Sequence, residues 1–311
     1  MTASSIPVID FQHNDEIISQ IGTACQEWGV FYVKNHGINT ESLLSEMRTF
    51  FSSPPTMKEK AKPINGYWGY FGVGRETTLE KKDWKEGMYY RLEYSNEYRS
   101  KMDTILLADN VWPDVDDHPN IKPVVQEYLT ATWKLGCQLL QCVAEHLGLQ
   151  KSFFIEKISE KRFQQIGMFR YPKCSVDSDS SPWGVGPHCD TGFLTILLQN
   201  NIGGLQIKTR AGQWIDVPPI DGTLVVNLCD IAEVWTNGFC HSVTHRVTKP
   251  VSADRYSVAV FIDPHLDCVI TPGEAAGNSK FVVDERLEKL ASGPFRVLDY
   301  AMELYSRSLK H

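Results

Sequence analysis

A run of short β-type segments between residues 194 and 262 constrains this fold more than any other feature of the sequence. The segments are rich in β-branched and apolar residues, and turn residues such as Gly, Asn and Pro separate them. Asn237-Gly238 predicts a hairpin between two of them, because both positions tolerate the positive φ of a type I′ turn. Short strands at these intervals favour a sandwich or jelly roll over a parallel sheet. The segments are Leu194–Leu198, Gly204–Lys208, Gln213–Val217, Leu224–Leu228, Val243–Thr248 and Tyr256–Ile262.

The chain before residue 162 has a different pattern, with apolar residues at helical spacing. We therefore predict a single domain, residues 1–311, with a mainly β core at 162–270. A helix-rich part at 1–161 and a C-terminal helix within 285–311 flank this core. The expected elements are a helix capped by Asn14, a strand at Val30–Val33, a helix opened by Thr40, a helix at Pro123–Leu147 ended by Gly148, and a last helix at Arg296–Leu309.

The composition is typical of a globular protein with a large core, since 42% of the residues are hydrophobic and 22% are charged. The formal net charge of -7 offers no basic excess to neutralise phosphates, which argues against a nucleic-acid partner. No apolar stretch approaches the roughly 20 residues that span a bilayer, and the start MTASSIPVIDF lacks the pattern of a signal peptide. We expect a cytoplasmic protein that acts on a small molecule without a membrane partner. The sequence leaves the oligomeric state open.

A His-x-Asp pair, His188-Cys189-Asp190, gives the first indication of a metal site. On an extended chain, side chains two residues apart point the same way, so His188 and Asp190 can reach one ion. Two histidines and one carboxylate are the ligand set of non-haem iron(II) oxygenases, which leaves positions open for substrate and O2. A second His-x-Asp pair, His265-Leu266-Asp267, is followed by no histidine before the C-terminal residue. The first pair is therefore the candidate metal site.

The third ligand is expected on a later β segment, where the sequence offers both His241 and His245. Both have the same strand parity, so periodicity does not choose between them. Arg255 and Ser257 form a further same-face pair on the last β segment. The planar guanidinium of an arginine binds a carboxylate through two hydrogen bonds, and a serine hydroxyl adds a donor. This pair can anchor the distal carboxylate of a small diacid that chelates the metal.

With these motifs the chain resembles the Fe(II)/2-oxoglutarate-dependent dioxygenases of the isopenicillin-N-synthase-like superfamily over nearly its whole length. The run His241–Val247 resembles the family's KSxxHRV segment, in which the histidine before Arg-Val is a ligand, so the resemblance selects His245 over His241. The family also has a tyrosine in an Asn-x-Tyr-Pro motif that touches the co-substrate; Tyr171 matches it, although Phe169 replaces the asparagine. Other matching runs are Pro7–Phe11, Gly29–Ile38, His188–Thr195, Gly203–Gln206, Trp235–Gly238 and Arg255–Ser257.

The resemblance implies a double-stranded β-helix (jelly roll) with flanking α-helices. It implies Fe(2+) on His188, Asp190 and His245, with 2-oxoglutarate and O2 as co-substrates and ascorbate as a supporting reductant. Arg255 and Ser257 would hold the far carboxylate of 2-oxoglutarate. Its oxidative decarboxylation would give succinate, CO2 and an iron(IV)-oxo species that abstracts hydrogen from the substrate, leading to hydroxylation, desaturation or ring closure.

Two other functions compete with this prediction. Some relatives use the Arg-x-Ser pair for a substrate or activator carboxylate, so a related Fe(II) oxidase that needs no 2-oxoglutarate is the alternative enzyme. A jelly-roll binding protein with an inactive metal site is the alternative without catalysis. The intact metal ligands and the intact Arg-x-Ser pair disfavour that alternative.

Residues 66–94 are the expected substrate wall, because the matching segment of the family often lies over the mouth of the barrel. Arg75 follows Gly72-Val73-Gly74 and can turn inward to bind a substrate carboxylate. Trp235, just before the ligand-bearing strand, is expected to close the opposite wall. The aromatic residues expected from the segment itself are Tyr67, Phe71, Trp84 and Tyr89.

Overall fold

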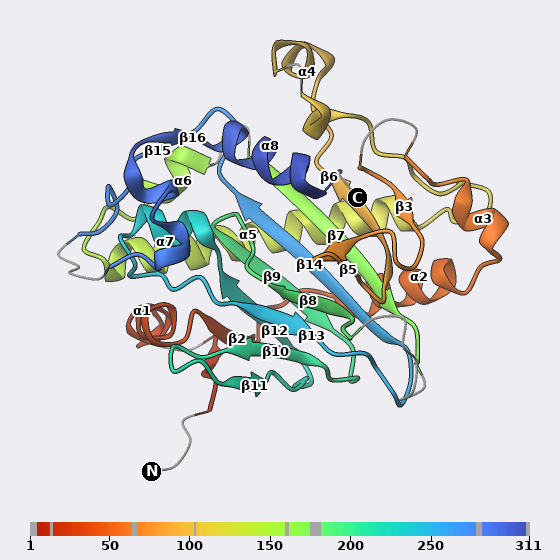
Figure 1. Cartoon of the computed structure of the whole chain (residues 1–311), viewed down its shortest axis with the longest axis horizontal. Coiled ribbons are helices and arrows are strands. Elements are labelled where there is room, and N and C mark those ends of the chain that lie inside the picture. Colours follow the sequence, from red (N-terminus) through yellow and green to blue (C-terminus); the bar gives the residue numbers. More distant parts are fainter. Residues whose placement is uncertain are drawn as a thin grey trace.

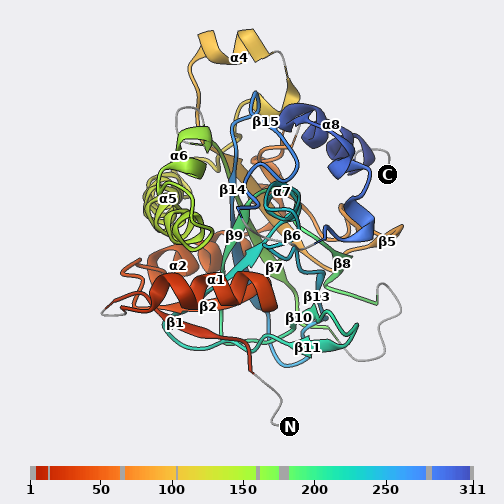
Figure 2. The ribbon, with the colours of Figure 1, turned by 90° about the vertical axis from the view of Figure 1, so that its left-hand side faces the viewer.

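Two β-sheets form the centre of the protein, and helices pack on the outer face of the larger sheet (Figures 1 and 2). The structure is a computed structural model, which describes residues 5–12, 15–63, 67–102, 104–158, 162–174, 182–277 and 282–308. The predicted helix cap Asn14 lies outside the described residues. No helix within the described ranges is long and apolar enough to cross a membrane.

The larger sheet has eight strands, in the order β1-β2-β12-β9-β14-β7-β6-β3. Only β1 and β2 pair in parallel; the other neighbours described are antiparallel. The strands are β1 (Val8–Asp10), β2 (Val30–Lys34), β12 (Thr223–Leu228), β9 (Leu194–Gln199), β14 (Arg255–Asp263), β7 (Phe163–Tyr171), β6 (Glu86–Arg91) and β3 (Tyr70–Phe71).

The smaller sheet has four antiparallel strands, in the order β11-β10-β13-β8. Two further antiparallel pairs of short strands, β4–β5 and β15–β16, lie outside both sheets. These strands are β11 (Trp214–Asp216), β10 (Leu205–Lys208), β13 (His245–Val247), β8 (Val185–His188), β4 (Thr77–Thr78), β5 (Lys81–Lys82), β15 (Val269–Ile270) and β16 (Phe295–Arg296).

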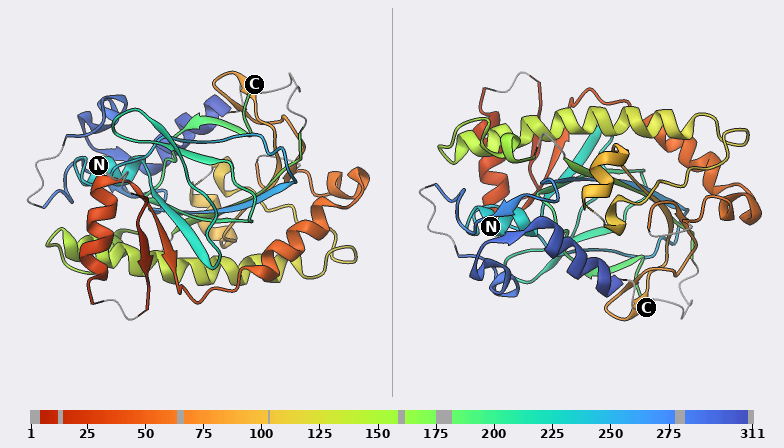
Figure 3. Two further views of the ribbon diagram at one scale, coloured as in Figure 1. Left: turned by 90° about the horizontal axis from the view of Figure 1, so that it is seen from below. Right: turned by 90° about the horizontal axis from the view of Figure 1, so that it is seen from above.

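Helix α5 runs along one side of the strands and α8 along the other (Figure 3). Helices α1 and α2 pack against α5. The helices are α1 (Ile17–Glu27), α2 (Glu41–Phe51), α3 (Pro55–Glu59), α4 (Asn96–Met102), α5 (Ile121–His146), α6 (Phe153–Ile158), α7 (Asp230–Trp235) and α8 (Val297–Ser308), with 3-10 turns at Ile105–Leu107, Glu285–Leu287 and Leu290–Ser292.

Strand alternation divides the residues of the larger sheet between two environments. Along β14, Val258, Val260 and Ile262 are 0% exposed and lie on the face toward α5. Ile262 packs so closely on this helix that a Cβ at Gly136 of α5 would lie 3.2 Å from its Cγ1. The alternate residues, from Arg255 to Asp263, face the cavity between the two sheets. The period of two therefore places the polar residues of β14 inside the molecule.

The six β segments expected between residues 194 and 262 are all strands, with ends shifted by one or two residues. The hairpin predicted at Asn237-Gly238 is wrong. Both residues do have positive φ, 51° and 80°, but they follow helix α7 rather than a strand. The positive φ values of Asn237 and Gly238 were predicted correctly. The element before them was not, because a turn with positive φ can end a helix as well as join two strands.

Candidate active site

A cavity of about 1240 Å³ lies between the two sheets. Its walls come from β7, β9, β12 and β14 of the larger sheet and from β8, β10 and β13 of the smaller one. Residues before and within β4 also contribute, as does Leu304 of α8. The cavity therefore collects side chains from strands that are far apart in the sequence.

Three of the predicted metal ligands meet in this cavity. One ligand atom from each of His188, Asp190 and His245 lies within 4.8 Å of the other two. Asp190 Oδ1 is 3.8 Å from His188 Nε2 and 3.7 Å from His245 Nε2, and the two imidazole centroids are 4.2 Å apart. β8 and β13 are neighbours, with His188 opposite His245 in the register. Strand pairing thus brings the two histidines together.

Backbone carbonyl groups fix how both imidazole rings face. His188 Nδ1 donates to the Gly186 carbonyl at 2.8 Å, and His245 Nδ1 donates to the Val243 carbonyl at 3.1 Å. A carbonyl oxygen only accepts hydrogen bonds, so in each neutral ring Nδ1 carries the proton and Nε2 keeps its lone pair. Both Nε2 atoms are the ones that face Asp190. This is the usual arrangement of metal-ligating histidines.

Asp190 is oriented by two side chains from the larger sheet. Its Oδ2 accepts hydrogen bonds from Thr195 Oγ1 at 2.6 Å and from Asn227 Nδ2 at 2.9 Å. Thr195 and Asn227 are register partners on β9 and β12, so they reach the carboxylate together. The other oxygen, Oδ1, is left facing the two histidines. The sequence did not predict these two orienting residues.

The protonation states also suit a divalent metal. The pKa of His188 is lowered to about 4, first by its removal from bulk water and then by the neighbouring His245. Burial alone would raise the pKa of Asp190, but the imidazoles of His245 and His188 and its two hydrogen bonds lower it below the usual range. A neutral histidine and an ionised aspartate are the forms that bind a metal ion.

A buried arginine stands in the same cavity. Arg255 is 1% exposed; its Nη1 donates to Ser257 Oγ at 3.0 Å and its Nη2 to Gln199 Oε1 at 3.2 Å. The guanidinium carbon lies 4.8 Å from the ring centroid of Tyr171, and Nε has no hydrogen-bond partner in the described part of the chain. Among the described residues no carboxylate pairs with Arg255, and burial lowers the pKa of its guanidinium. A buried cation of this kind fits an anionic ligand.

Two family models match this chain. The one described as the 2OG-Fe(II) oxygenase superfamily matches residues 162–264, and the one described as non-haem dioxygenase in morphine synthesis N-terminal matches residues 6–115. A 1-aminocyclopropane-1-carboxylate oxidase of Dictyostelium mucoroides is 31% identical, over 85% of this chain and 83% of its own length. The chain belongs to the 2OG-Fe(II) oxygenase superfamily.

Solved structures of other proteins have the same fold as this superfamily member. A full-length Neurospora crassa protein, solved in complex with alpha-KG, superposes with a TM-score of 0.82 at 24% identity, covering 97% of this chain and 96% of its own. JOX2 in complex with 2OG, Fe and JA superposes with a TM-score of 0.80 at 28% identity, covering 97% and 85%. The protein is thus an Fe(II)/2-oxoglutarate-dependent dioxygenase, as its resemblance to that family implied.

The residues of this oxygenase fit both groups that the superfamily uses. Two Nε2 lone pairs and one carboxylate oxygen make the two-histidine, one-carboxylate set that iron(II) prefers. The uncompensated guanidinium of Arg255, with the Ser257 hydroxyl beside it, suits a carboxylate of 2-oxoglutarate. The second histidine candidate, His241, does not join them: it is 8% exposed, and its Nδ1 lies 3.5 Å from Glu233 Oε2.

A buried ionic cluster forms another part of the cavity wall. Lys85 Nζ lies 2.8 Å from Glu76 Oε2 and 4.5 Å from the centroid of the Phe169 ring. Tyr67 Oη donates to Glu76 Oε1 at 2.5 Å, and Tyr89 Oη donates to the other oxygen at 3.4 Å. Glu76 directly precedes β4, so these contacts hold the β4–β5 pair at the cavity. Neither Lys85 nor Glu76 was among the predicted site residues.

Four of the six residues predicted for the substrate wall lie at the cavity. Tyr67, Phe71, Arg75 and Tyr89 all line the cavity. Arg75 is an exposed residue, and it forms no ion pair with any residue that the structure describes.

Two of the predicted wall residues lie elsewhere, and that part of the prediction is wrong. Trp84 does not line the cavity, and its Nε1 donates to the Pro172 carbonyl at 2.9 Å. Trp235 is 0% exposed, and its ring packs against those of Phe154 and Phe193. It is in a helix, which buries it in an aromatic cluster instead of placing it on a strand facing the cavity.

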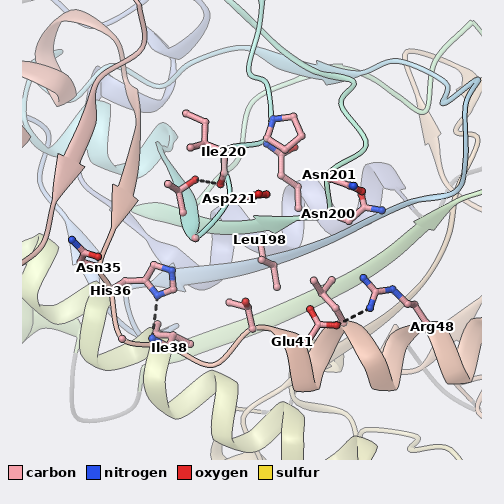
Figure 4. Close-up of a pocket in the computed structure, with 17 residues that line it drawn as sticks. Asn35, His36, Ile38, Glu41, Arg48, Leu198, Asn200, Asn201, Ile220 and Asp221 are labelled. Atoms are coloured by element: carbon pink, nitrogen blue, oxygen red, sulfur yellow. Dashed lines mark hydrogen bonds and ion pairs between the residues drawn. The ribbon is translucent and has the colours of Figure 1, made fainter.

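A second cavity, of about 540 Å³, lies between the start of α2 and the loops after β9 and before β12 (Figure 4). Its polar lining includes His36, Asn200 and Asp221, and the ion pair between Glu41 and Arg48 crosses one side. It contains none of the three metal-ligand candidates. The larger cavity is therefore the candidate active site.

Proposed function

We propose that this dioxygenase oxidises a small, carboxylate-bearing metabolite in the cavity between the sheets, by hydroxylation, desaturation or oxidative ring closure. One observation carries the proposal: a single cavity holds the His-Asp-His cluster together with a buried arginine and an exposed arginine, neither of which has an ion-pair partner among the described residues. The relative from Dictyostelium is named for 1-aminocyclopropane-1-carboxylate, itself a small carboxylate. Succinate and CO2 are the other products.

We assign His188, Asp190 and His245 to the iron, and Arg255, Ser257 and Tyr171 to 2-oxoglutarate. When bound, iron(II) supplies O2 activation coupled to the oxidation of 2-oxoglutarate. The chain's own part is positional: the Gly186 and Val243 carbonyls hold the imidazole rings in place. Burial of Arg255 keeps its charge away from water, which strengthens its interaction with a carboxylate. We also assign the two-sheet core to a double-stranded β-helix within one domain.

Succinate release with iron(II), 2-oxoglutarate and ascorbate, measured together with mass change over a library of small acids, tests this function. His188→Ala, Asp190→Ala and His245→Ala are each expected to abolish turnover without unfolding the protein, because the large core does not depend on one ion. His241→Ala is the matched control and should retain substantial activity. An active His245→Ala with an inactive His241→Ala would overturn the ligand assignment. Substrate oxidation without succinate would favour the related oxidase that needs no 2-oxoglutarate.

Arg75 is the residue we assign to the substrate carboxylate. Arg75→Gln removes the charge but keeps a polar side chain, so the KM for a carboxylate substrate should rise while the 2-oxoglutarate requirement stays near that of the wild type. Arg210→Gln is the matched control, because Arg210 is exposed and does not line the cavity. Equal turnover of the acid and its methyl ester by the wild-type enzyme would rule out recognition of the carboxylate.

A further inference from the structure

One carboxylate in the cavity is used neither by the metal cluster nor by the proposed co-substrate site. Asp263, the last residue of β14, is 7% exposed and lines the cavity with Gln165 of β7. Gln165 Nε2 donates to Asp263 Oδ2 at 3.0 Å. The other oxygen, Oδ1, has no hydrogen-bond partner within the described ranges, and no basic side chain described there pairs with Asp263.

Asp263 Oδ1 lies directly against a glycine, Gly192. A Cβ at Gly192 would lie 1.5 Å from Asp263 Oδ1, so a larger residue there would displace the carboxylate. Gly192 is two residues after Asp190 in the sequence, which places the unpartnered oxygen beside the loop that carries a metal ligand. The sheet register agrees, because Phe261, two residues before Asp263 on β14, pairs with Thr195, whose hydroxyl binds Asp190.

A buried carboxylate oxygen without a donor is unfavourable, and such atoms are rare in folded proteins outside functional sites. Burial raises the pKa of Asp263 to about 7, against the lowering effect of the Gln165 hydrogen bond, and the charge of Asp190 adds to the rise. A cationic donor from a molecule in the cavity would compensate the charge of this carboxylate.

We propose that Asp263 and Gln165 form a substrate subsite that binds a protonated amine beside the metal centre. An ammonium group has three donors and no acceptor, so it complements a carboxylate oxygen better than a hydroxyl group does. The inference rests on the proposed function, since it names a second group of the same substrate. With Arg75 on the carboxylate, the substrate class becomes small amino acids.

Matched probes test the subsite in the wild-type enzyme. Each probe pair is an α- or ω-amino acid and the hydroxy acid of the same length, which replaces the ammonium group by a hydroxyl group of similar size. Binding is measured by calorimetry without O2, with iron(II) and 2-oxoglutarate present, and turnover is measured as succinate release. For at least one pair, the amino acid should bind about tenfold more tightly or better, the effect of a charge-assisted hydrogen bond. Equal binding within every pair, or binding of no probe, would overturn the inference.

Asp263→Asn tests the residue, because it keeps the shape of the side chain and removes its charge. The preference for the amino acid should fall about tenfold, while the affinity for 2-oxoglutarate stays unchanged. Asp267→Asn is the control: it makes the same change four residues later, where the side chain is 44% exposed. An unchanged preference in Asp263→Asn would also overturn the inference. If the wild type forms no succinate with any substrate, the proposed function itself fails, and the calorimetric comparison still decides the subsite.

Discussion

At the scale of single residues, the buried side chain of Arg255 favours the binding of a carboxylate. Its guanidinium is held by Ser257 and Gln199, yet no acid pairs with it among the residues described. Without a ligand, a buried cation has lost its hydration and has no opposite charge to compensate for this loss. The carboxylate of 2-oxoglutarate would therefore relieve a cost that is already present in the free protein.

Arg255→Ala should raise the apparent KM for 2-oxoglutarate by at least about tenfold, because truncating one partner of a buried charged pair typically costs about 2–5 kcal/mol. Ser257→Ala removes one neutral donor and should have a smaller effect. Succinate formation as a function of 2-oxoglutarate concentration measures both variants. A normal 2-oxoglutarate dependence in Arg255→Ala, with a raised KM for the substrate, would instead assign this arginine to the substrate carboxylate.

At the scale of single residues, the sequence predicted the site residues that lie two apart in the chain and missed those that come from other strands. Arg255 and Ser257 lie on β14, where strand parity was sufficient to pair them, whereas Asp190 lies just after β8 and still meets His188. Thr195 and Asn227 orient Asp190 from two other strands. Asn227 reaches Asp190 only through the register of β12 with β9, which no local pattern encodes.

Among the elements, the β4–β5 pair is held at the cavity by side-chain contacts, but the turn that joins its two strands has an unfavourable backbone conformation. Glu76, next to β4, is held by Lys85 and two tyrosines. The turn itself consists of Leu79 and Glu80, whose φ values are 50° and 63°. Left-handed backbone costs roughly 1–2 kcal/mol for an ordinary residue, and a two-residue turn of this type favours Asn-Gly.

Replacing both turn residues, as Leu79→Asn with Glu80→Gly, should slow hydrogen exchange of the amides in residues 77–82 and stabilise the β4–β5 pair by about 1 kcal/mol. Little packing is lost, since Leu79 is 69% exposed. Lys81→Gly is the control, because it puts glycine on the strand beside the turn and should speed the same exchange. Faster exchange in the Asn-Gly variant would show that the positive φ values do not limit this pair.

Element type was predictable where the pattern was long or strictly alternating. Strand β14 and helix α5 were both expected, with ends within two residues of those observed. Helix α7 was missed because its six residues are all buried, so no amphipathic period distinguishes it from a strand. Trp235 was assigned to the cavity wall because it precedes the ligand-bearing strand, whereas it is the last residue of this helix.

For the molecule as a whole, strand β14 links the parts of the site. We assign its first residue, Arg255, to the co-substrate, and its last residue, Asp263, lies against Gly192 in the loop that follows Asp190. A mainly β core of sandwich or jelly-roll type with helices around it was predictable from the sequence, whereas the order in which the strands pair was not. Closure depends on which strands pair, and hydrophobic alternation leaves that choice open.

Asp263 also gives the folded protein a specific pH dependence. Aspartate in the unfolded chain titrates near 3.8, whereas burial raises the pKa of Asp263 to about 7 in the folded state. Between these values the native state holds a proton that the unfolded state has released, so the free energy of unfolding falls as the pH rises. Above pH 7 the ionisation of Asp263 lowers the free energy of unfolding by its full amount, on the order of 4 kcal/mol at most.

Asp263→Asn removes that titration, so the metal-free variant should unfold at a higher temperature than the wild type at pH 8. The difference in Tm should shrink as the pH falls through 7 and be small near pH 4, where Asp263 is protonated in the folded wild type. Thermal unfolding of both proteins from pH 4 to 8 measures it, with Asp267→Asn as the exposed control. A Tm difference that stays constant with pH would contradict the raised pKa. A gain at pH 8 would mean that the charge of Asp263 destabilises the fold, as expected for a group that serves binding.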